Sequence, residues 1–448
     1  MNIVEMDEKR VPLSKMYLTM VLPVVLSMVT TMVYSVADTW FISATGNTGL
    51  IAGVSLNAPV LTLLMAFGNI YGQGGSTLVS RLIGQRNTRS VREVSSACFW
   101  LAIATGVVIG AVMLIFRTPI LYLLGASEET MQYAAGYYVW IAVGAPFIVL
   151  SFIPRNILRS EGMSRESMVG SVGGSVLNII LDPILIFVFG LGAGGAAIAT
   201  VLGYVFTDVY SVVVIRRRSK LLSVSIREAK TTRSSLAQIF GIGIPAAVTN
   251  IMQSISAVLV NQFLLPYGTD QIAAMGIALK VALVGQLILV GMSFGSLPLF
   301  AYYFGGENRA RFRELLRFCM RVILVTAAAL TAVLFAAAPV LIRFFVEDAG
   351  LISAGTLMLR LQVISFVFVG VVLLLTIVFQ SMGRAKEMLF LSVSRQGIVF
   401  LAVLLIASAL FGYYGVIAAQ AAADAVSAVL AVLLWMNLKR RLEPSGSD

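Results

Sequence analysis

Two series of polar side chains interrupt apolar stretches of the sequence at helical spacing, and each series ends in a carboxylate. The first consists of Ser27, Thr31, Ser35 and Asp38, and the second of Ser171, Ser175, Asn178 and Asp182. Residues three or four positions apart lie on one face of an α-helix, so each series predicts a polar stripe. A carboxylate in such an apolar helix is energetically costly, which makes Asp38 and Asp182 candidate functional residues.

The two acids are expected at the same depth. Both precede the predicted end of their helix, near Ala44 or Gly190, by about 10 Å at ~1.5 Å per residue. Thr200 lies at a similar distance beyond the predicted start of the next helix. We therefore expect Asp38, Asn178, Asp182 and Thr200 to converge.

Such a cluster offers two chemistries. Carboxylate, amide and hydroxyl oxygens can bind a small hard cation such as Na⁺. Two adjacent carboxylates instead oppose double ionisation and can hold a proton. We favour H⁺ as the ion, with Na⁺ bound at Asp38, Asn178, Asp182 and Thr200 as the alternative. In a purely structural interpretation, Asn178 and the hydroxyls join helices and each Asp is a satisfied packing residue.

The second half of the chain carries a different set of polar residues. Lys280, Arg360 and Asp424 each lie within predicted helices, about 10–15 Å from one end. We consider an ion pair involving Asp424, which could either stabilise the packing of helices or form part of a second proton-transfer pathway. Asp208 lies deeper and has no obvious partner, so a water-filled cavity and a coupling role both stay open.

The nineteen methionines could form an adaptable surface for lipophilic ligands of varied shape, although a single Met side chain more often packs in the protein interior. The candidate chamber residues are Met28, Thr31, Met32, Tyr34, Ser35, Asn57 and Met65.

The elements that must position these residues follow from composition. Of 448 residues, 59% are hydrophobic and 12% charged, against roughly 45–50% and 25% in a soluble domain. A soluble globule is excluded, and continuous apolar runs exclude a transmembrane β-barrel. We predict an all-α membrane protein of twelve transmembrane helices. The segments are 14–43, 50–79, 93–116, 130–154, 167–189, 194–215, 237–264, 272–303, 318–342, 353–381, 388–411 and 414–438.

The net charge of +11 reflects the orientation of the chain in the membrane. With both termini cytoplasmic, nearly all basic residues fall on the inner side, including Arg155, Arg159 and Arg395, so no nucleic acid is needed to explain them. The exceptions are Arg117, Lys280, Arg343 and Arg360. The first helix is too long for a signal peptide and is retained. Cys98 and Cys319 are expected to pack as small hydrophobes rather than form a disulfide.

The two halves of the sequence resemble each other. Gly84, Asn87 and Arg92-Glu93 recur at one constant offset as Gly305, Asn308 and Arg313-Glu314. Since six helices is an even number, the lobes should be pseudo-symmetric about an axis along the membrane normal. We predict an amino-terminal six-helix lobe over 1–216, a cytoplasmic linker over 217–236 and a carboxy-terminal six-helix lobe over 237–448.

Over nearly its whole length the sequence resembles bacterial members of the multidrug and toxic compound extrusion (MATE) family. The features that carry the resemblance are Pro23 with Ala37-Asp38-Thr39, Leu82-Ile83-Gly84-Gln85, Arg159-Ser160-Glu161-Gly162, Asn178-Ile179-Ile180-Leu181-Asp182-Pro183 and Gly192-Ala193-Gly194-Gly195-Ala196-Ala197.

The resemblance implies a multidrug efflux antiporter that exchanges lipophilic, mostly cationic compounds for H⁺ or Na⁺ by alternating access and confers antibiotic resistance. It assigns the coupling role to Asp38, Asn178, Asp182 and Thr200. Other members also have acids in helices 7 and 10, where this chain offers Gln253 and Asn261 in helix 7 and no acid in helix 10. A second-lobe site of that kind is therefore not expected.

Two alternatives were weighed. A lipid-linked oligosaccharide flippase would need a strongly basic cavity, whereas the predicted cluster is acidic. A membrane enzyme is remote because no nucleophile or metal-ligand constellation is visible, and no ATP-binding motif occurs. We expect no cofactor, no catalytic residue, no nucleic-acid partner, and a monomer in the lipid bilayer of the bacterial cytoplasmic membrane.

Overall fold

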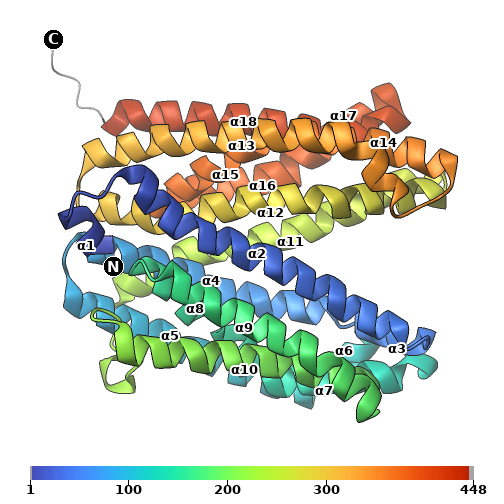
Figure 1. Ribbon diagram of the computed structural model, residues 1–448, viewed down its shortest axis with the longest axis horizontal. Helices are drawn as coiled ribbons and strands as arrows, with labels where there is room; N and C mark the ends of the chain where they lie inside the picture. Colours follow the sequence, from blue (N-terminus) through green and yellow to red (C-terminus); the bar gives the residue numbers. More distant parts are fainter. Residues whose placement is uncertain (1–2, 443–448) are drawn as a thin grey trace. The chain divides into compact units, whose positions relative to one another are not determined.

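The computed structural model describes residues 3–442, and within them every regular element is helical (Figure 1). Twelve segments are long and apolar enough to span a membrane, which confirms the predicted number. The structure divides into two compact units. One runs to Ala247 and includes Ala301–Glu307, and the other comprises Val248–Phe300 with the chain from Asn308 onward. The lobe and linker boundaries proposed from sequence halves stay a prediction.

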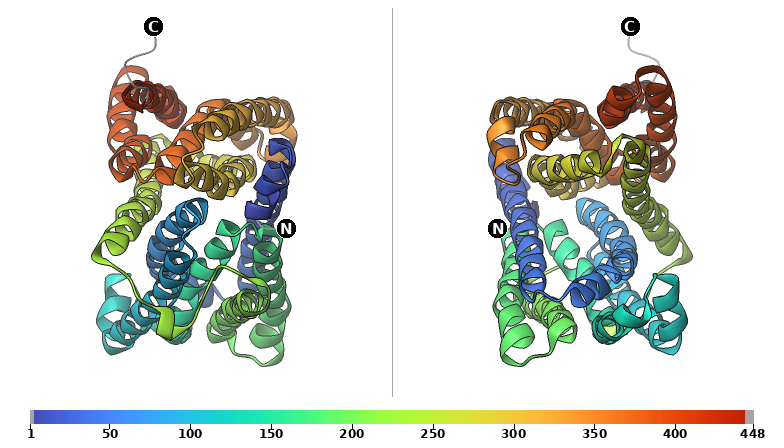
Figure 2. Two further views of the ribbon diagram at one scale, coloured as in Figure 1. Left: turned by 90° about the vertical axis from the view of Figure 1, so that its left-hand side faces the viewer. Right: turned by 90° about the vertical axis from the view of Figure 1, so that its right-hand side faces the viewer.

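The first unit contains a short amino-terminal helix and the first six spans. Its helices are α1 (Ile3–Glu8), α2 (Leu13–Ala44), α3 (Thr48–Ser55), α4 (Ala58–Gly84), α5 (Thr88–Ile115), α6 (Arg117–Leu123), α7 (Glu128–Leu150), α8 (Phe152–Ser160), α9 (Ser164–Pro183), the π-helix Ile184–Val188, α10 (Gly192–Arg218) and the 3₁₀ turn Ile226–Glu228. Within this unit α2 packs along α9, and α9 along α10 (Figure 2).

The second unit is built mainly from the last six spans. Its helices are α12 (Thr269–Gly305), α13 (Arg309–Arg343), α14 (Ala349–Ile364), α15 (Phe366–Ser381), α16 (Ala385–Val393), the π-helix Ser394–Ile398, α17 (Val399–Phe411) and α18 (Tyr413–Leu442). The boundaries between units fall inside two helices, α11 (Arg233–Leu264), which leads into the 3₁₀ turn Leu265–Tyr267, and α12.

The repeated motif in each half forms the same helical hairpin. Arg86 and Glu307 each adopt a positive φ, of 57° and 54° respectively, directly before an asparagine. Asn87 and Asn308 then cap α5 and α13, because each side chain accepts a hydrogen bond from a backbone N–H three residues later. The sequence repeat is therefore a repeat of local structure. Both cysteines are buried and free, as expected.

A buried carboxylate organises one end of the first unit. The carboxylate of Glu161 accepts hydrogen bonds from the Ser219 hydroxyl and, at 3.1 Å, from the Lys220 backbone N–H. Its backbone carbonyl accepts from the N–H of Ile3. Glu161 thereby links α1 to the segment that follows α10. Burial raises the pKa of Glu161, although these hydrogen bonds oppose the shift.

Candidate functional site

The two predicted acids lie together inside the first unit. Asp38 is on α2, Asp182 is next to last in α9, and their carboxyl groups lie close enough to interact electrostatically. Asp182 is fully buried, and Oδ1 of Asp38 is buried as well. Two neighbouring carboxyl groups oppose double ionisation, so this pair can hold a single proton.

Asn178 and Thr200 complete the cluster. Asn178 lies one turn before Asp182 on α9, and its Nδ2 donates to Thr200 Oγ1 of α10 over 3.4 Å. Both side chains are buried. Burial and hydrogen bonding thus place an amide oxygen and a hydroxyl beside the acid pair.

The cluster has an excess of acceptors over donors. Among the described residues, Asp38 Oδ1, Asn178 Oδ1 and both carboxylate oxygens of Asp182 have no hydrogen-bond donor. A buried acceptor without a donor costs about 1–3 kcal/mol, and more when it is charged. A proton or a small cation would offset this cost, so the arrangement fits either ion. No group of three or more His, Cys, Asp or Glu that could hold a metal occurs within residues 3–442.

Three hydroxyl groups earlier in the stripes are satisfied within their own helices. The hydroxyls of Ser27, Thr31 and Ser171 each donate to a carbonyl four residues earlier, at 2.8–3.0 Å. The buried oxygens without a donor in these stripes lie on Asp38, Asn178 and Asp182, at the ends of the stripes. The break at Pro183 matches this position, because α9 gives way there to a π-helix.

Tyrosines surround the cluster, and sequence reasoning missed two of them. Tyr34 of α2 and Tyr137 of α7 both lie close to Thr200, and Tyr204 of α10 lies close enough to interact electrostatically with Asp38. Tyr34 had been assigned to the chamber, whereas nothing in the local pattern distinguishes Tyr137 or Tyr204 from ordinary packing aromatics.

Asp208 has a neighbour that the sequence did not indicate. Arg155, assigned from the sequence to an inner loop, lies in α8 and interacts electrostatically with Asp208 and Tyr204. Both Asp208 oxygens are buried without a hydrogen bond among the described residues. Asp208 and Arg155 form a separate, deeper charge pair at longer range.

The chamber candidates divide into two groups. Met28, Met32 and Met65 are partly exposed, and Thr31 and Ser35 are exposed. Asn57 is instead fully buried, where its Nδ2 donates to the carbonyls of Gly53 and Ala134 at 2.9 and 3.2 Å. Its amide closes the break between α3 and α4, and its assignment to the chamber stays a prediction.

The second unit holds one buried ion pair. Nε of Arg395 donates to Oδ1 of Asp424 over 2.8 Å, and Nε2 of Gln420 donates to the same oxygen at 3.2 Å. Arg395 is therefore not an inner-loop residue, because it lies in the π-helix between α16 and α17 with its side chain 11% exposed. Lys280 is exposed and has no salt bridge within the described chain.

A family model named MatE matches the chain twice, over residues 23–184 and 245–406. The two matches repeat at nearly the offset of the helical hairpins, so the internal repeat extends through both halves.

Similar proteins agree with this match. The chain is 32% identical over 421 residues to "Multidrug export protein MepA" of Staphylococcus saprophyticus, covering 94% of this chain and 93% of that protein. It is 31% identical over 437 residues to the protein of the same name from Staphylococcus aureus strain MRSA252, covering 98% and 96%. The crystal structure of MATE in the straight conformation has 25% identity and a TM-score of 0.88, covering 95% of this chain and 96% of the other. The bent conformation has 24% identity, a TM-score of 0.88 and 95% coverage of both chains.

Proposed function

We propose, from the premise that this chain belongs to the multidrug and toxic compound extrusion (MATE) family, that it exports lipophilic, mostly cationic compounds in exchange for H⁺, with Na⁺ as the alternative ion. The family premise makes the chain a multi-pass bacterial membrane transporter and not an enzyme. The proposed substrates follow from relatives that are named multidrug export proteins.

The observation that carries the coupling step is the set of unsatisfied oxygens on Asp38, Asn178 and Asp182. Two neighbouring acids inside an apolar unit are unfavourable when both are charged. Loading with one proton, or with Na⁺ held by the acids, Asn178 and Thr200, removes that penalty. The loaded and empty sites then favour different packing of α2 against α9, and an ion shifts an equilibrium only through such a difference.

We place the drug in the chamber lined by Met28, Thr31, Met32, Tyr34, Ser35 and Met65, close to the acids. A cationic drug and the coupling ion would both be stabilised by the same two carboxylates. They would therefore compete, and each would weaken binding of the other by the same factor. We further propose that both termini are cytoplasmic, that the two halves alternate in access, and that a monomer suffices.

The test is transport of a fluorescent lipophilic cation into liposomes that contain the purified protein. Imposed H⁺ and Na⁺ gradients are applied separately, and binding of the same cation is titrated against pH and Na⁺. We expect uptake driven by one gradient and drug affinity that falls as that ion is added. Uptake that ignores both gradients would rule out antiport, and affinity indifferent to both ions would rule out the shared site.

A further inference from the structure

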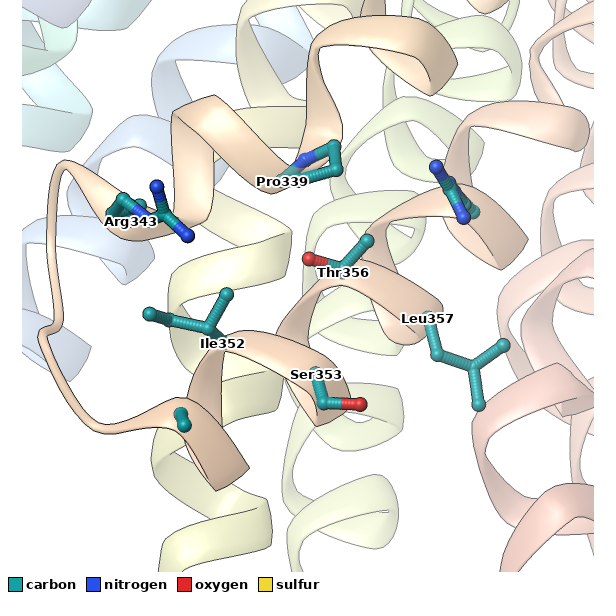
Figure 3. Close-up of a pocket in the computed structure, with 8 residues that line it drawn as sticks. Pro339, Arg343, Ile352, Ser353, Thr356 and Leu357 are labelled. Atoms are coloured by element: carbon teal, nitrogen blue, oxygen red, sulfur yellow. The ribbon is translucent and has the colours of Figure 1, made fainter.

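We propose that a cavity between α13 and α14 of the second unit binds a phosphate group, carried by an anionic lipid or free in solution. The cavity has a volume of about 530 Å³ (Figure 3). Its lining residues are Pro339, Arg343, Ala349, Ile352, Ser353, Thr356, Leu357 and Arg360. Half of these residues are apolar, and the other half are two arginines, a serine and a threonine, with no acid.

Arg360 is held in place by a defect in the facing helix. Pro339 lies inside α13 and has no backbone N–H, so the carbonyl of Phe335, four residues earlier, loses its helical partner. Nε of Arg360 donates to that carbonyl over 3.3 Å, and the guanidinium lies 4.8 Å from the centre of the Phe335 ring. These two contacts fix the plane of the guanidinium and leave its two Nη groups for a ligand.

The charge of the cavity is not neutralised by the protein. Neither Arg343 nor Arg360 has a salt bridge within the described residues. The carboxylate of Asp348, which precedes α14, accepts from the N–H of Leu351 and does not line the cavity. Two arginines without a carboxylate partner give the cavity a positive charge, which an anion in the cavity would neutralise.

Hydroxyl groups complete the donor set. Ser353, Thr356 and Arg360 follow one another at spacings of three and four residues, so they share one face of α14. Oγ1 of Thr356 is buried and has no hydrogen-bond partner. Guanidinium groups with adjacent hydroxyls are a typical donor set for phosphate oxygens.

The position also explains two exceptions in the charge pattern. Arg343 and Arg360 lie toward the side of the membrane that carries few basic residues, Arg117 and Lys280 being the other exceptions. A lipid phosphate occurs at that interface, where the end of α13 and the start of α14 meet. The ligand is recognised by its phosphate, and the two sources of that phosphate are separated by experiment.

The test uses the full chain purified in detergent and two probes, titrated by calorimetry. The first probe is a short-chain phosphatidylglycerol, with the matching diacylglycerol as the uncharged control, and the second is inorganic phosphate. We expect the phosphatidylglycerol to bind and the diacylglycerol not to bind. Binding of inorganic phosphate at the same residues would show that the phosphate alone suffices, and its absence would identify the ligand as a lipid.

Three variants locate the site. Arg343→Gln and Arg360→Gln should each weaken phosphatidylglycerol about tenfold or more, as expected for a lost charged hydrogen bond. Thr356→Val keeps the side-chain shape and should weaken it by a smaller factor. The matched control is Arg117→Gln, since Arg117 is an exposed arginine that begins α6 and is absent from the cavity.

Thermal unfolding is measured for every variant, and Arg360→Lys provides a version that retains the charge if Arg360→Gln fails to fold. A wild-type protein that binds neither probe would overturn the proposal. An equal loss of binding in Arg117→Gln would also overturn it, because general surface charge would then account for the affinity.

Discussion

Arg395 and Asp424 form a buried ion pair of 2.8 Å at the positions where the other half of the chain has two glycines in contact. Moving back by 221 residues, the separation of Gly84 and Gly305, leads from Arg395 to Gly174 and from Asp424 to Gly203. A Cβ on Gly174 would lie 2.5 Å from the Gly203 carbonyl oxygen, and a Cβ on Gly203 would lie 2.8 Å from the Gly174 carbonyl. Close backbone packing in the first unit is thus replaced by a charge pair and a π-helix in the second.

This pair predicts a specific pattern of stability. Asp424→Asn leaves a buried guanidinium without its carboxylate and should lower the free energy of unfolding by about 3–5 kcal/mol. Arg395→Met should have a similar effect, whereas the double variant Arg395→Met/Asp424→Leu should recover most of the loss because no charge is left unpaired. The measurement is denaturant unfolding in mixed micelles.

The exposed acid Asp270, at the start of α12, provides the control, and Asp270→Asn should change the free energy of unfolding by less than about 0.5 kcal/mol. Losses that simply add in the double variant would show that Arg395 and Asp424 do not stabilise one another.

The acid pair of the first unit predicts a loss of coupling without a loss of fold. Asp38→Asn and Asp182→Asn keep the side-chain shape but prevent the pair from binding a proton between carboxylates. Each should reduce gradient-driven efflux about tenfold or more, corresponding to ~1.4 kcal/mol or more of lost coupling. Transport in liposomes with matched protein amounts measures this.

Ser171→Ala is the matched control on α9, because the Ser171 hydroxyl bonds only to a carbonyl of its own helix. Its efflux should stay near the wild-type rate. Wild-type efflux by a well-folded Asp38→Asn protein would remove Asp38 from the coupling site.

Glu161 predicts how stability depends on pH. Its pKa is raised in the folded protein by burial, so the folded state binds the proton more tightly than the unfolded state. The free energy of unfolding should therefore fall as pH rises from 4.5, the ordinary pKa of a glutamate, to the raised pKa of Glu161 in the folded protein. Glu161→Gln cannot titrate at this position. As pH rises over that range, the thermal midpoint of the wild type should therefore fall relative to that of Glu161→Gln. A difference that does not change with pH would contradict the shift.

The acid cluster was accessible from sequence because its determinants are local. Helical spacing places Asp38 and Asp182 at the ends of two polar stripes, and rise per residue matches their depth with Thr200. The fold followed similarly, since apolar length sets the number of spans.

The surroundings of Arg395, Asn57 and Tyr137 could not be predicted from sequence, because they depend on contacts between distant segments. The sequence predicts an inner-loop position for Arg395 because basic residues near a helix end usually lie in loops. Only the position of Asp424 on α18 shows why Arg395 is buried. Asn57 donates to the carbonyl of Ala134, 77 residues away, and the local sequence around Asn57 gives no sign of this contact. Tyr137 reaches Thr200 from another helix and carries no local signal.

The final prediction concerns the shape of α2, which contains both Pro23 and Asp38. Pro23 cannot donate to the carbonyl of Thr19, so the helix has a weak point about 22 Å from Asp38 at ~1.5 Å per residue. Loading of the acid pair should let the Asp38 end of α2 pack more closely on α9, because the paired charges no longer need water. Spin labels at Val36 on α2 and Val143 on α7, both exposed, can report the change, with Cys98 and Cys319 replaced.

The separation is measured at low and high pH, each with and without Na⁺. We expect it to differ between low and high pH, and Asp38→Asn should give one distribution at every pH. A response to Na⁺ alone would make Na⁺ the coupling ion. A single distribution under all four conditions in the wild-type protein would eliminate movement of α2 as the link between ion binding and transport.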